Sequence, residues 1–321
     1  MRIRLWSRLP LLAACLLFVA TAVAADGTFE QTFTVSGAVD LDAQTHSGNI
    51  TVRTGSAGSV FVRGTIKVRR RYSSDADSIV RQLQTNPPFE QTGNTIRIRN
   101  IDDQLKRRVS ISYEITTPAE TVADTSTGSG NINIDGVRGP VEANTGSGNI
   151  GIANVSDTTR TNTGSGNIEL SSIGASSRAG TGSGNIVARG VSGDFAGRTG
   201  SGNVIIDQAS GGNVEMNSGS GNLEARGVHG SLNASTGSGG VTAEGEMTSD
   251  WKLRTSSGSI QVRLPSEAAF TIEARSSSGS IEVNHPMTVQ GRIGRREVHG
   301  TVRGGGALLA VSTSSGSIRI D

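Results

Sequence analysis

The chain has 321 residues, 18% of them charged, and a formal net charge of only +2. So balanced a charge gives no support for nucleic-acid binding, which favours a strongly basic chain. Aromatic residues make up 3% of the chain and there are 44 glycines. This composition disfavours a thick aromatic core and favours a thin fold held by backbone hydrogen bonds.

The first 25 residues have the features of a secretory signal peptide. Three arginines flank the start of an apolar stretch, 9–20, that is short for a membrane span, and Ala22-Val23-Ala24 resembles a cleavage site. We expect cleavage after Ala24 or Ala25 and a periplasmic or secreted mature chain without a transmembrane segment. Cleavage leaves 30 − 3 = 27 basic residues against 28 acidic ones, so the mature chain is nearly neutral.

A lipoprotein is the alternative, because Leu12-Ala13-Ala14-Cys15 matches a lipoprotein box. The short spacer between Arg8 and Cys15, and the apolar residues that continue to Val23, favour ordinary cleavage. That cleavage removes the only cysteine. The mature chain would then have no disulfide, no cysteine-ligated metal and no cysteine nucleophile.

Residues 26–126 predict an irregular β region with one short helix. Ser74 or Asp75 can cap this helix, which is expected to run to about Leu83 before Pro87-Pro88 stops it. The segment His46-Ser47-Gly48-Asn49-Ile50 is an isolated, early copy of the motif that dominates the rest of the chain. Alternating apolar residues predict strands over 29–35, 60–68, 95–101 and 109–115.

From residue 127 the motif T-G-S-G-N-I recurs with a period of 18 residues. Later copies drift to spacings of 19, 18, 19 and 21, and the last copy follows after 37, which leaves room for one degenerate coil. The two residues before the recurring position are always Ser and Gly. The recurring positions are Asn131, Asn149, Asn167, Asn185, Asn203, Asn222, Gly240, Ser259, Ser280 and Ser317.

Each repeat contains two stretches of alternating apolar and polar residues, separated by turns. Aligned repeats give continuous apolar columns, which stacked coils rising ~4.8 Å each would bury. One column is Ile132, Ile150, Ile168, Ile186, Val204, Leu223, Val241, Ile260, Ile281 and Ile318. A second is Val141, Thr159, Ser177, Phe195, Val214, Leu232, Trp251, Ile272 and Leu309, and a third, at a corner, is Val137, Val155, Ile173, Val191, Ala209 and Val228.

The sequence therefore predicts an all-β fold: a single-stranded parallel β-helix, or β-solenoid, of about ten 18-residue coils, expected to be right-handed. The irregular N-terminal region with its short helix would cap it. We divide the chain into a signal peptide (1–25), the irregular β N-terminal part and cap (26–126) and the regular solenoid (127–321). One outward column alternates in charge, which supports the register: Arg189, Asp207, Arg226, Glu244 and Arg263.

The repeated turns predict structure rather than chemistry. Phosphate-binding loops precede a helix and do not recur tenfold. Calcium-binding β-roll repeats place an aspartate in each loop, whereas here the position is mostly Asn or Ser, so we expect neutral side-chain ladders. We therefore predict no catalytic residue, no cofactor site and no metal site, although His285 and His299 could converge as a metal pair.

A polysaccharide-active β-helix enzyme would need carboxylates clustered on one face. The outward acids are instead spread over the coils, often beside basic residues, which indicates a solvated charged face. Two basic runs, 69–71 and 106–108, are also expected to be solvated and could meet anionic lipid or glycan. The outward acids are Asp135, Glu142, Glu169, Asp207, Glu215, Glu224, Glu244 and Glu282.

The repeated S-G-N-I and S-S-G-S-I copies resemble those of a bacterial adhesin-like β-strand-repeat family of unknown function, related to the "putative auto-transporter adhesin head domain". The resemblance runs from about residue 29 to the end, and the helix near 75–83, the segment 113–118 and the closing segment 304–320 also fit it. It implies the solenoid fold and transfers no catalytic residues. The sequence does not predict an auto-transporter barrel.

Together these observations predict a non-catalytic exported cell-envelope β-solenoid that acts as an adhesin-like or scaffold surface. The alternative is a polysaccharide-active β-helix enzyme. The expected partner is an envelope component, either glycan or protein, and not nucleic acid. Self-association through the solenoid ends is also possible, because exposed sheet edges invite pairing.

Overall fold

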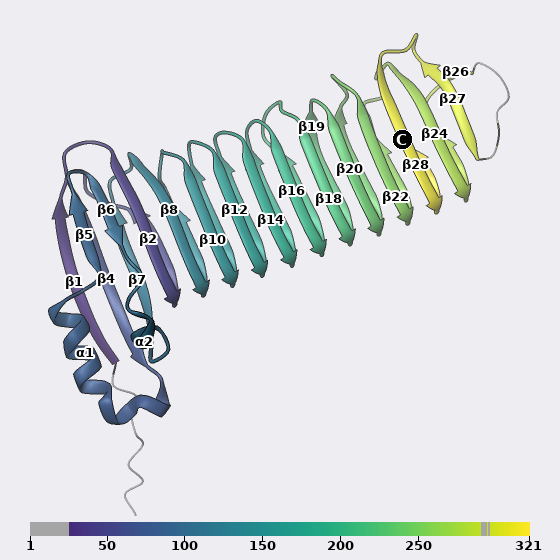
Figure 1. Cartoon of the computed structure of the whole chain (residues 1–321). Helices are drawn as coiled ribbons and strands as arrows, with labels where there is room; N and C mark the ends of the chain where they lie inside the picture. The colour runs from purple at the N-terminus through teal and green to yellow at the C-terminus, as the bar shows by residue number, and fades with distance from the viewer. Residues whose placement is uncertain (1–25, 290–293, 295) are drawn as a thin grey trace, which may run out of the picture.

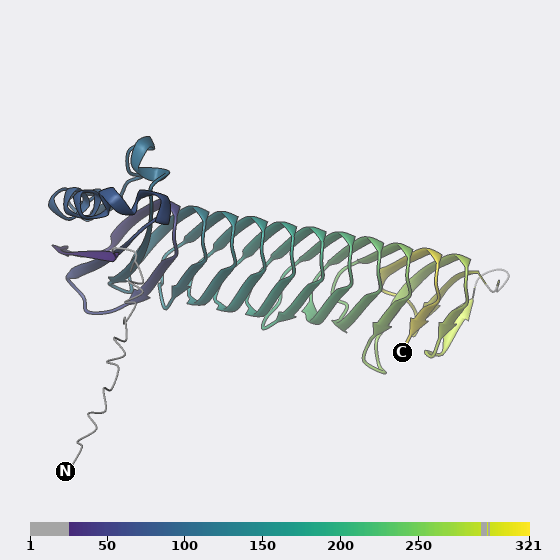
Figure 2. The same cartoon turned by 90° about the horizontal axis from the view of Figure 1, so that it is seen from below.

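The computed structural model describes residues 26–289, 294 and 296–321, so the signal peptide and Cys15 lie outside the described residues. Two long sheets, of 14 and 15 strands, run the length of an elongated solenoid (Figures 1 and 2) and confirm the predicted β-solenoid. In the regular part the chain alternates between the sheets. The 15-stranded sheet takes β8 (Thr121–Ser129), β10 (Val141–Ser147), β12 (Thr159–Ser165), β14 (Ser177–Ser183), β16 (Phe195–Ser201), β18 (Val214–Ser220), β20 (Leu232–Ser238) and β22 (Trp251–Ser257). The 14-stranded sheet takes β9 (Ile132–Asp135), β11 (Ile150–Val155), β13 (Ile168–Ile173), β15 (Ile186–Val191), β17 (Val204–Gln208), β19 (Leu223–His229), β21 (Val241–Glu246) and β23 (Ile260–Arg263).

The predicted apolar columns form the core between the two sheets. Ile150 and Ile168 are direct neighbours in parallel register, and both are 1% exposed. One assignment in the corner column is wrong: Gln208, not Ala209, pairs with Val191 and is buried. The Gln208 side chain is tolerated there because its Nε2 donates to the Gly193 carbonyl at 3.0 Å.

The turn residues of the motif are explained by how closely the coils stack. A Cβ added at Gly166 would overlap the carbonyl oxygen of Gly148 in the preceding coil, so only glycine fits. The hydroxyl of Thr163, which is buried, donates to the same carbonyl at 2.9 Å. The Asn149 side-chain oxygen accepts the backbone N–H of Asn167 at 2.9 Å, and this bond recurs from coil to coil.

The asparagine ladder predicts a graded response at Asn167, whose Oδ1 accepts the N–H of Asn185 at 2.9 Å. Asn167→Ala removes this acceptor and is expected to lower the free energy of unfolding by about 1 kcal/mol in urea titrations. Asn167→Asp keeps an acceptor and should be only mildly destabilising, with or without calcium. Equal stability of the Ala variant and the parent, or a large rise in Tm on adding calcium, would contradict the neutral ladder.

The stack does not follow chain order at its N-terminal end. β2 (Val39–Ser47) and β3 (Ile50–Thr54) form a coil that pairs with β8 and β9, so the early motif copy is a regular coil of the solenoid. On its other side lie β6 (Thr95–Ile98) and β7 (Val109–Thr117), which come later in the sequence. β4 (Ser59–Val68), β1 (Asp26–Thr34) and β5 (Phe89–Thr92) then close the two sheets with antiparallel pairing.

The C-terminal end shows the same inversion. β28 (Ala307–Ser315) lies between β22 and β24 (Phe270–Ser278), and β29 (Ile318–Ile320) lies between β23 and β25 (Ile281–Val283). The prediction of a degenerate coil before the last motif copy is wrong. The last two coils also do not stack in chain order, because β28 and β29 lie inside β24 and β25. The intervening residues form β26 (Met287–Val289) and β27 (Glu297–Val302), and β27 pairs antiparallel with the outer edge of β24. The last coil therefore pairs with the inner edge of β24.

The predicted helix is α1 (Ala76–Thr85), which follows a 3-10 turn, η1 (Arg70–Asp75), and buries Ile79 and Leu83. Asp75 is its N-cap residue but makes no side-chain cap bond. A second helix, α2 (Asp103–Lys106), was not expected from the sequence; the Asp102 carboxylate caps it by accepting the N–H of Gln104 at 2.7 Å. Both helices lie at the N-terminal end of the stack (Figure 2). Neither helix among the described residues is long and apolar enough to cross a membrane.

Candidate binding face on the 15-stranded sheet

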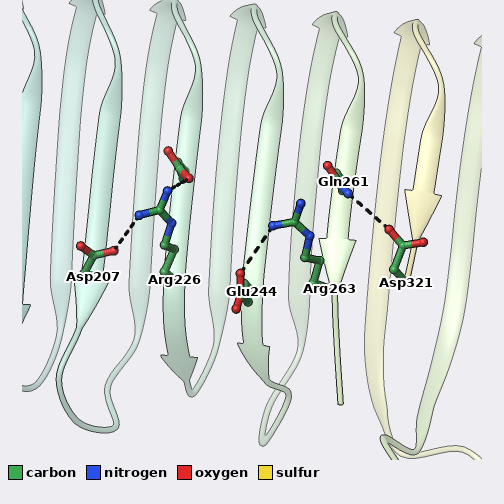
Figure 3. Close-up of polar contacts among 7 residues, drawn as sticks. Asp207, Arg226, Glu244, Gln261, Arg263 and Asp321 are labelled. Atoms are coloured by element: carbon green, nitrogen blue, oxygen red, sulfur yellow. Dashed lines mark hydrogen bonds and ion pairs between the residues drawn. The ribbon is translucent and has the colours of Figure 1, made fainter. Parts of the chain in front are cut away.

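The outer face of the 14-stranded sheet carries charges that are compensated between neighbouring coils. Arg226 lies 3.8 Å from Asp207, and Arg263 lies 3.7 Å from Glu244 (Figure 3). The register also places Arg189 beside Asp207, so these neighbours follow the predicted alternation of charge. These pairs are exposed and each contributes at most about 1 kcal/mol. This face is a solvated, self-compensated surface.

The outer face of the 15-stranded sheet segregates its charges instead. Asp42 of β2, Asp124 of β8 and Glu142 of β10 are consecutive neighbours in register. The same column continues with Arg160 of β12 and Arg178 of β14. We call Asp42, Asp124 and Glu142, with the adjacent Asp40, the acidic group, and the two arginines the basic pair. Like charges directly opposite each other on neighbouring strands are destabilising.

The electrostatics of the acidic group reflect this crowding. Partial burial, together with the carboxylates of Glu142, Asp42 and Asp40, raises the pKa of Asp124 above its ordinary value. The folded state therefore binds this proton more tightly than the unfolded chain does. Stability contributed by Asp124 falls as the pH rises from the ordinary carboxyl range through the raised pKa. The arrangement costs stability at neutral pH, and the fold itself does not require it.

The basic pair also lacks ion pairs in the described part of the chain, although Arg160 lies beside Glu142 in register. Within the described residues, Arg160 and Arg178 form no ion pair, whereas Arg138, Arg189 and Arg198 each contact a glutamate between 2.7 and 3.4 Å away. The guanidinium groups of the basic pair are exposed on the sheet surface. They are free to meet a partner.

A shallow groove of about 1040 Å³ runs across the starts of these strands and joins the two charged groups. Asp40, Asp124 and Glu142 line one part of it, and Arg160 and Arg178 line the next. Another lining residue, Val122, is 44% exposed, and it is the single large hydrophobic residue exposed among those that the structure describes. Charge, shape and an exposed apolar side chain thus coincide on this face.

Most of the outward acids expected from the sequence lie beside a basic residue, as predicted. Glu169, Asp207, Glu215, Glu224 and Glu244 each contact an arginine. Glu142 forms no ion pair with any described residue, although it lies in register between Asp124 and Arg160. The members contributed by the N-terminal part, Asp40, Asp42 and Asp124, were missed. The signal was present: Asp42 and Asp124 stand seven residues before Asn49 and Asn131, as Glu142 does before Asn149.

The two histidines that could form a metal pair, His285 and His299, have different surroundings. His285 is buried edge-on against Phe270, with ring centroids 5.5 Å apart. His299 contacts the Glu297 carboxylate at 2.8 Å, and this bond, with Arg275, holds the pKa of Glu297 below its usual range. Over the described residues there is no group of three or more His, Cys, Asp or Glu side chains able to hold a metal ion.

The two basic runs meet at the N-terminal cap. The backbone N–H of Arg69 donates to the carbonyl of Arg108 at 2.8 Å. The guanidinium groups of Arg71 and Arg108 lie 5.0 and 5.3 Å from the centre of the Tyr72 ring, and Arg108 also lies 3.9 Å from Asp75. Stacking and ion pairing within the cap thus account for the position of these two arginines.

Three solved structures illustrate what the chain is similar to. One is described as a "putative lipid binding protein" from Parabacteroides distasonis (13% identity, 92% of this chain and 97% of that chain, TM-score 0.40). Others are a "putative adhesin" from Bacteroides fragilis (12%, 92% and 97%, TM-score 0.29) and a "putative cell adhesion protein" from Clostridium sporogenes (10%, 91% and 98%, TM-score 0.21). At these TM-scores they carry no argument. No curated protein matches the chain.

The family comparison covers the C-terminal part of the solenoid. Residues 177–321, from β14 through the inserted last coil, match the model of the Toastrack DUF4097 domain. This match spans both the regular coils and the closing segment that the sequence resemblance included. Residues 177–321 are therefore similar to a Toastrack DUF4097 domain, and the predicted resemblance to an adhesin-like family of unknown function is confirmed.

Proposed function

We propose that this protein is a non-catalytic, exported cell-envelope β-solenoid whose 15-stranded sheet presents an adhesin-like or scaffold binding surface. The signal-peptide features of residues 1–25 support export to the periplasm or beyond. The single observation that carries the binding role is the segregation of the acidic group from the basic pair along one groove. Charges left uncompensated by the fold are available to a partner.

The composition of the face favours a charged partner over a neutral one. Binding of neutral sugars commonly uses exposed aromatic rings, whereas Phe195, the aromatic side chain that reaches this groove, is buried. The groove offers instead carboxylates, guanidinium groups and the hydroxyls of Thr158 and Ser176. A partner with complementary charges fits this chemistry.

The alternative is a polysaccharide-active β-helix enzyme, and the acidic group favours it specifically. Asp124 has a raised pKa and lies beside Glu142, which is the pairing that a general acid and its partner carboxylate require. The groove is an open surface, which does not exclude water from a reacting bond. We therefore place binding first and hydrolysis second.

The test compares the mature chain, residues 26–321, with two variants that carry the same change in net charge. Arg160→Glu/Arg178→Glu changes the basic pair, whereas Arg226→Glu/Arg263→Glu changes the 14-stranded face. We expect co-sedimentation with isolated envelope material that is lost only in the first variant. Equal binding of all three would contradict the proposed face. Release of reducing sugars from envelope polysaccharide, abolished by Asp124→Asn, would establish the enzymatic alternative instead.

A further inference from the structure

We infer that the occupant of this face is a second copy of the chain, bound in an antiparallel, two-fold symmetric dimer. This inference rests on the proposed binding role of the 15-stranded sheet. Its basis is the order of charges along one outward column, which is complementary to itself when reversed. From the N-terminal end the column reads Arg97, Asp42, Asp124, Glu142, Arg160, Arg178, Ala196 and Glu215.

The symmetry follows directly from this order. Consider a two-fold axis that lies in the interface, runs parallel to the strands and passes between β10 and β12. This axis places the column opposite the partner's column, which runs in the reverse order. Glu142 then faces the partner's Arg160, and Asp124 faces the partner's Arg178. Further out, Arg97 faces the partner's Glu215, while Asp42 faces the small, neutral Ala196. Each facing pair on this column is opposite in charge or has one neutral member.

The neighbouring columns are mostly neutral and add one like-charged contact to this packing. On one side of the charged column the residues next to the axis are uncharged, with Asn144 beside Asn162 in register, and Arg198 lies further along the same column. On the other side, exposed Val122 faces the partner's Ser176, which covers its apolar surface. Asp40 faces the partner's Asp194 in this arrangement, a like-charged contact at the end of its column. Asp194 already accepts the N–H of Asn213 at 2.8 Å. The two central facing pairs of opposite charge on each copy outweigh this contact, and the third, Arg97 with Glu215, adds less because Glu215 also contacts Arg198 at 2.7 Å.

The face is large enough for a stable dimer. The eight strands from β6 to β18 in the 15-stranded sheet cover about 38 Å at ~4.8 Å per strand, and strands of seven residues are about 23 Å long. Each copy therefore offers roughly 900 Å², near the ~800 Å² per partner of a standard interface. In the monomer, the acidic group repels itself and so does the basic pair. The dimer offsets both repulsions with attractions between copies.

A pair of complementary variants tests this geometry. In the acidic variant, Arg160→Glu/Arg178→Glu, the whole column centre is negative; in the basic variant, Asp124→Lys/Glu142→Lys, it is positive. Sedimentation velocity of the mature chain at low salt should give a dimer that dissociates as salt screens the contacts. Each variant alone should be monomeric, with dimerisation at least about 100-fold weaker. An equimolar mixture should form a heterodimer, because opposite charges again face each other.

The control and the contradicting results separate this inference from the proposed function. Arg226→Glu/Arg263→Glu, on the opposite sheet, should dimerise like the parent, and urea titrations establish that all variants are folded. A parent that stays monomeric at every concentration, or a mixture that stays monomeric, would overturn the dimer. If such a monomer still loses envelope binding through Arg160→Glu/Arg178→Glu, the proposed function stands with a different occupant. If dimerisation holds but envelope binding does not depend on this face, the dimer stands and the face serves self-assembly.

Discussion

Ile168→Asp is expected to destroy the stacking of the coils around β13. Ile168 is 1% exposed and lies between Ile150 and Ile186 in parallel register. The substitution removes a core side chain and buries a carboxylate that has no partner there. Loss of the side chain alone costs about 2–5 kcal/mol, and burial of an unpaired charge adds to it. We expect a loss of more than about 4 kcal/mol in the free energy of unfolding.

Damage from Ile168→Asp should spread to both neighbouring coils, because each coil of a solenoid is held by the next. Hydrogen exchange should show lost protection in β11 and β15 as well as in β13. Two variants act as controls: Ile168→Val should cost only about 1 kcal/mol, and Asn133→Asp, which places the same charge on the solvent face, should change stability by less than about 0.5 kcal/mol. Unfolding of Ile168→Asp at the urea midpoint of the parent would show the register to be wrong.

The second large effect tests the order of the last coils. Ser257 of β22 and Ser315 of β28 are neighbours in parallel register, although 58 residues separate them, and both are exposed. Neighbouring strands lie ~4.8 Å apart, a separation that a disulfide spans. Ser257→Cys/Ser315→Cys should therefore form a crosslink on mild oxidation. Closing a loop of this length should raise the free energy of unfolding by about 2–4 kcal/mol.

The matched control uses the coil that would stack there if the chain followed sequence order. Ser257→Cys/Ser278→Cys places the thiols on β22 and β24, which are two strand spacings apart because β28 lies between them. At roughly 9.6 Å the pair cannot close without backbone movement, so it should remain reduced. If this control oxidised rapidly while the Ser257→Cys/Ser315→Cys pair stayed reduced, the coils would stack in chain order.

The inverted order of the terminal coils gives the solenoid a distinct way of ending. The first and last motif copies of the chain lie in coils that are internal to the stack, and the outermost strands are β1, β5, β25 and β26. Three of them pair antiparallel, β1 with β4, β5 with β6 and β26 with β27, whereas β25, a strand of three residues, pairs parallel with β29. Edge strands that pair antiparallel or are very short are poor templates for adding a further parallel coil. Lateral contact through the sheet face is then a more favourable route to self-association than end-to-end stacking.

The sequence by itself determined the solenoid and its register. The 18-residue period repeats the same turn residues, and Gly166 is required because the coils approach closely at that point. Local alternation then decides which residues face inward, so Ile132 and Ile168 could be assigned to the core. These properties depend on interactions within one coil or between identical neighbours, which a periodic sequence reports directly.

Only the tertiary structure decided which coils are neighbours at the two ends, and with it the candidate face. Motif copies are nearly equivalent in pairing, so the sequence does not distinguish β24 from β28 as the neighbour of β22; the antiparallel edge strand β27 makes that choice. Likewise, Asp42 lies beside Asp124, 82 residues later in the sequence, only because β2 pairs with β8. The acidic group thus forms through pairing between strands that are far apart in the sequence. The local sequence pattern does not favour one such pairing over another.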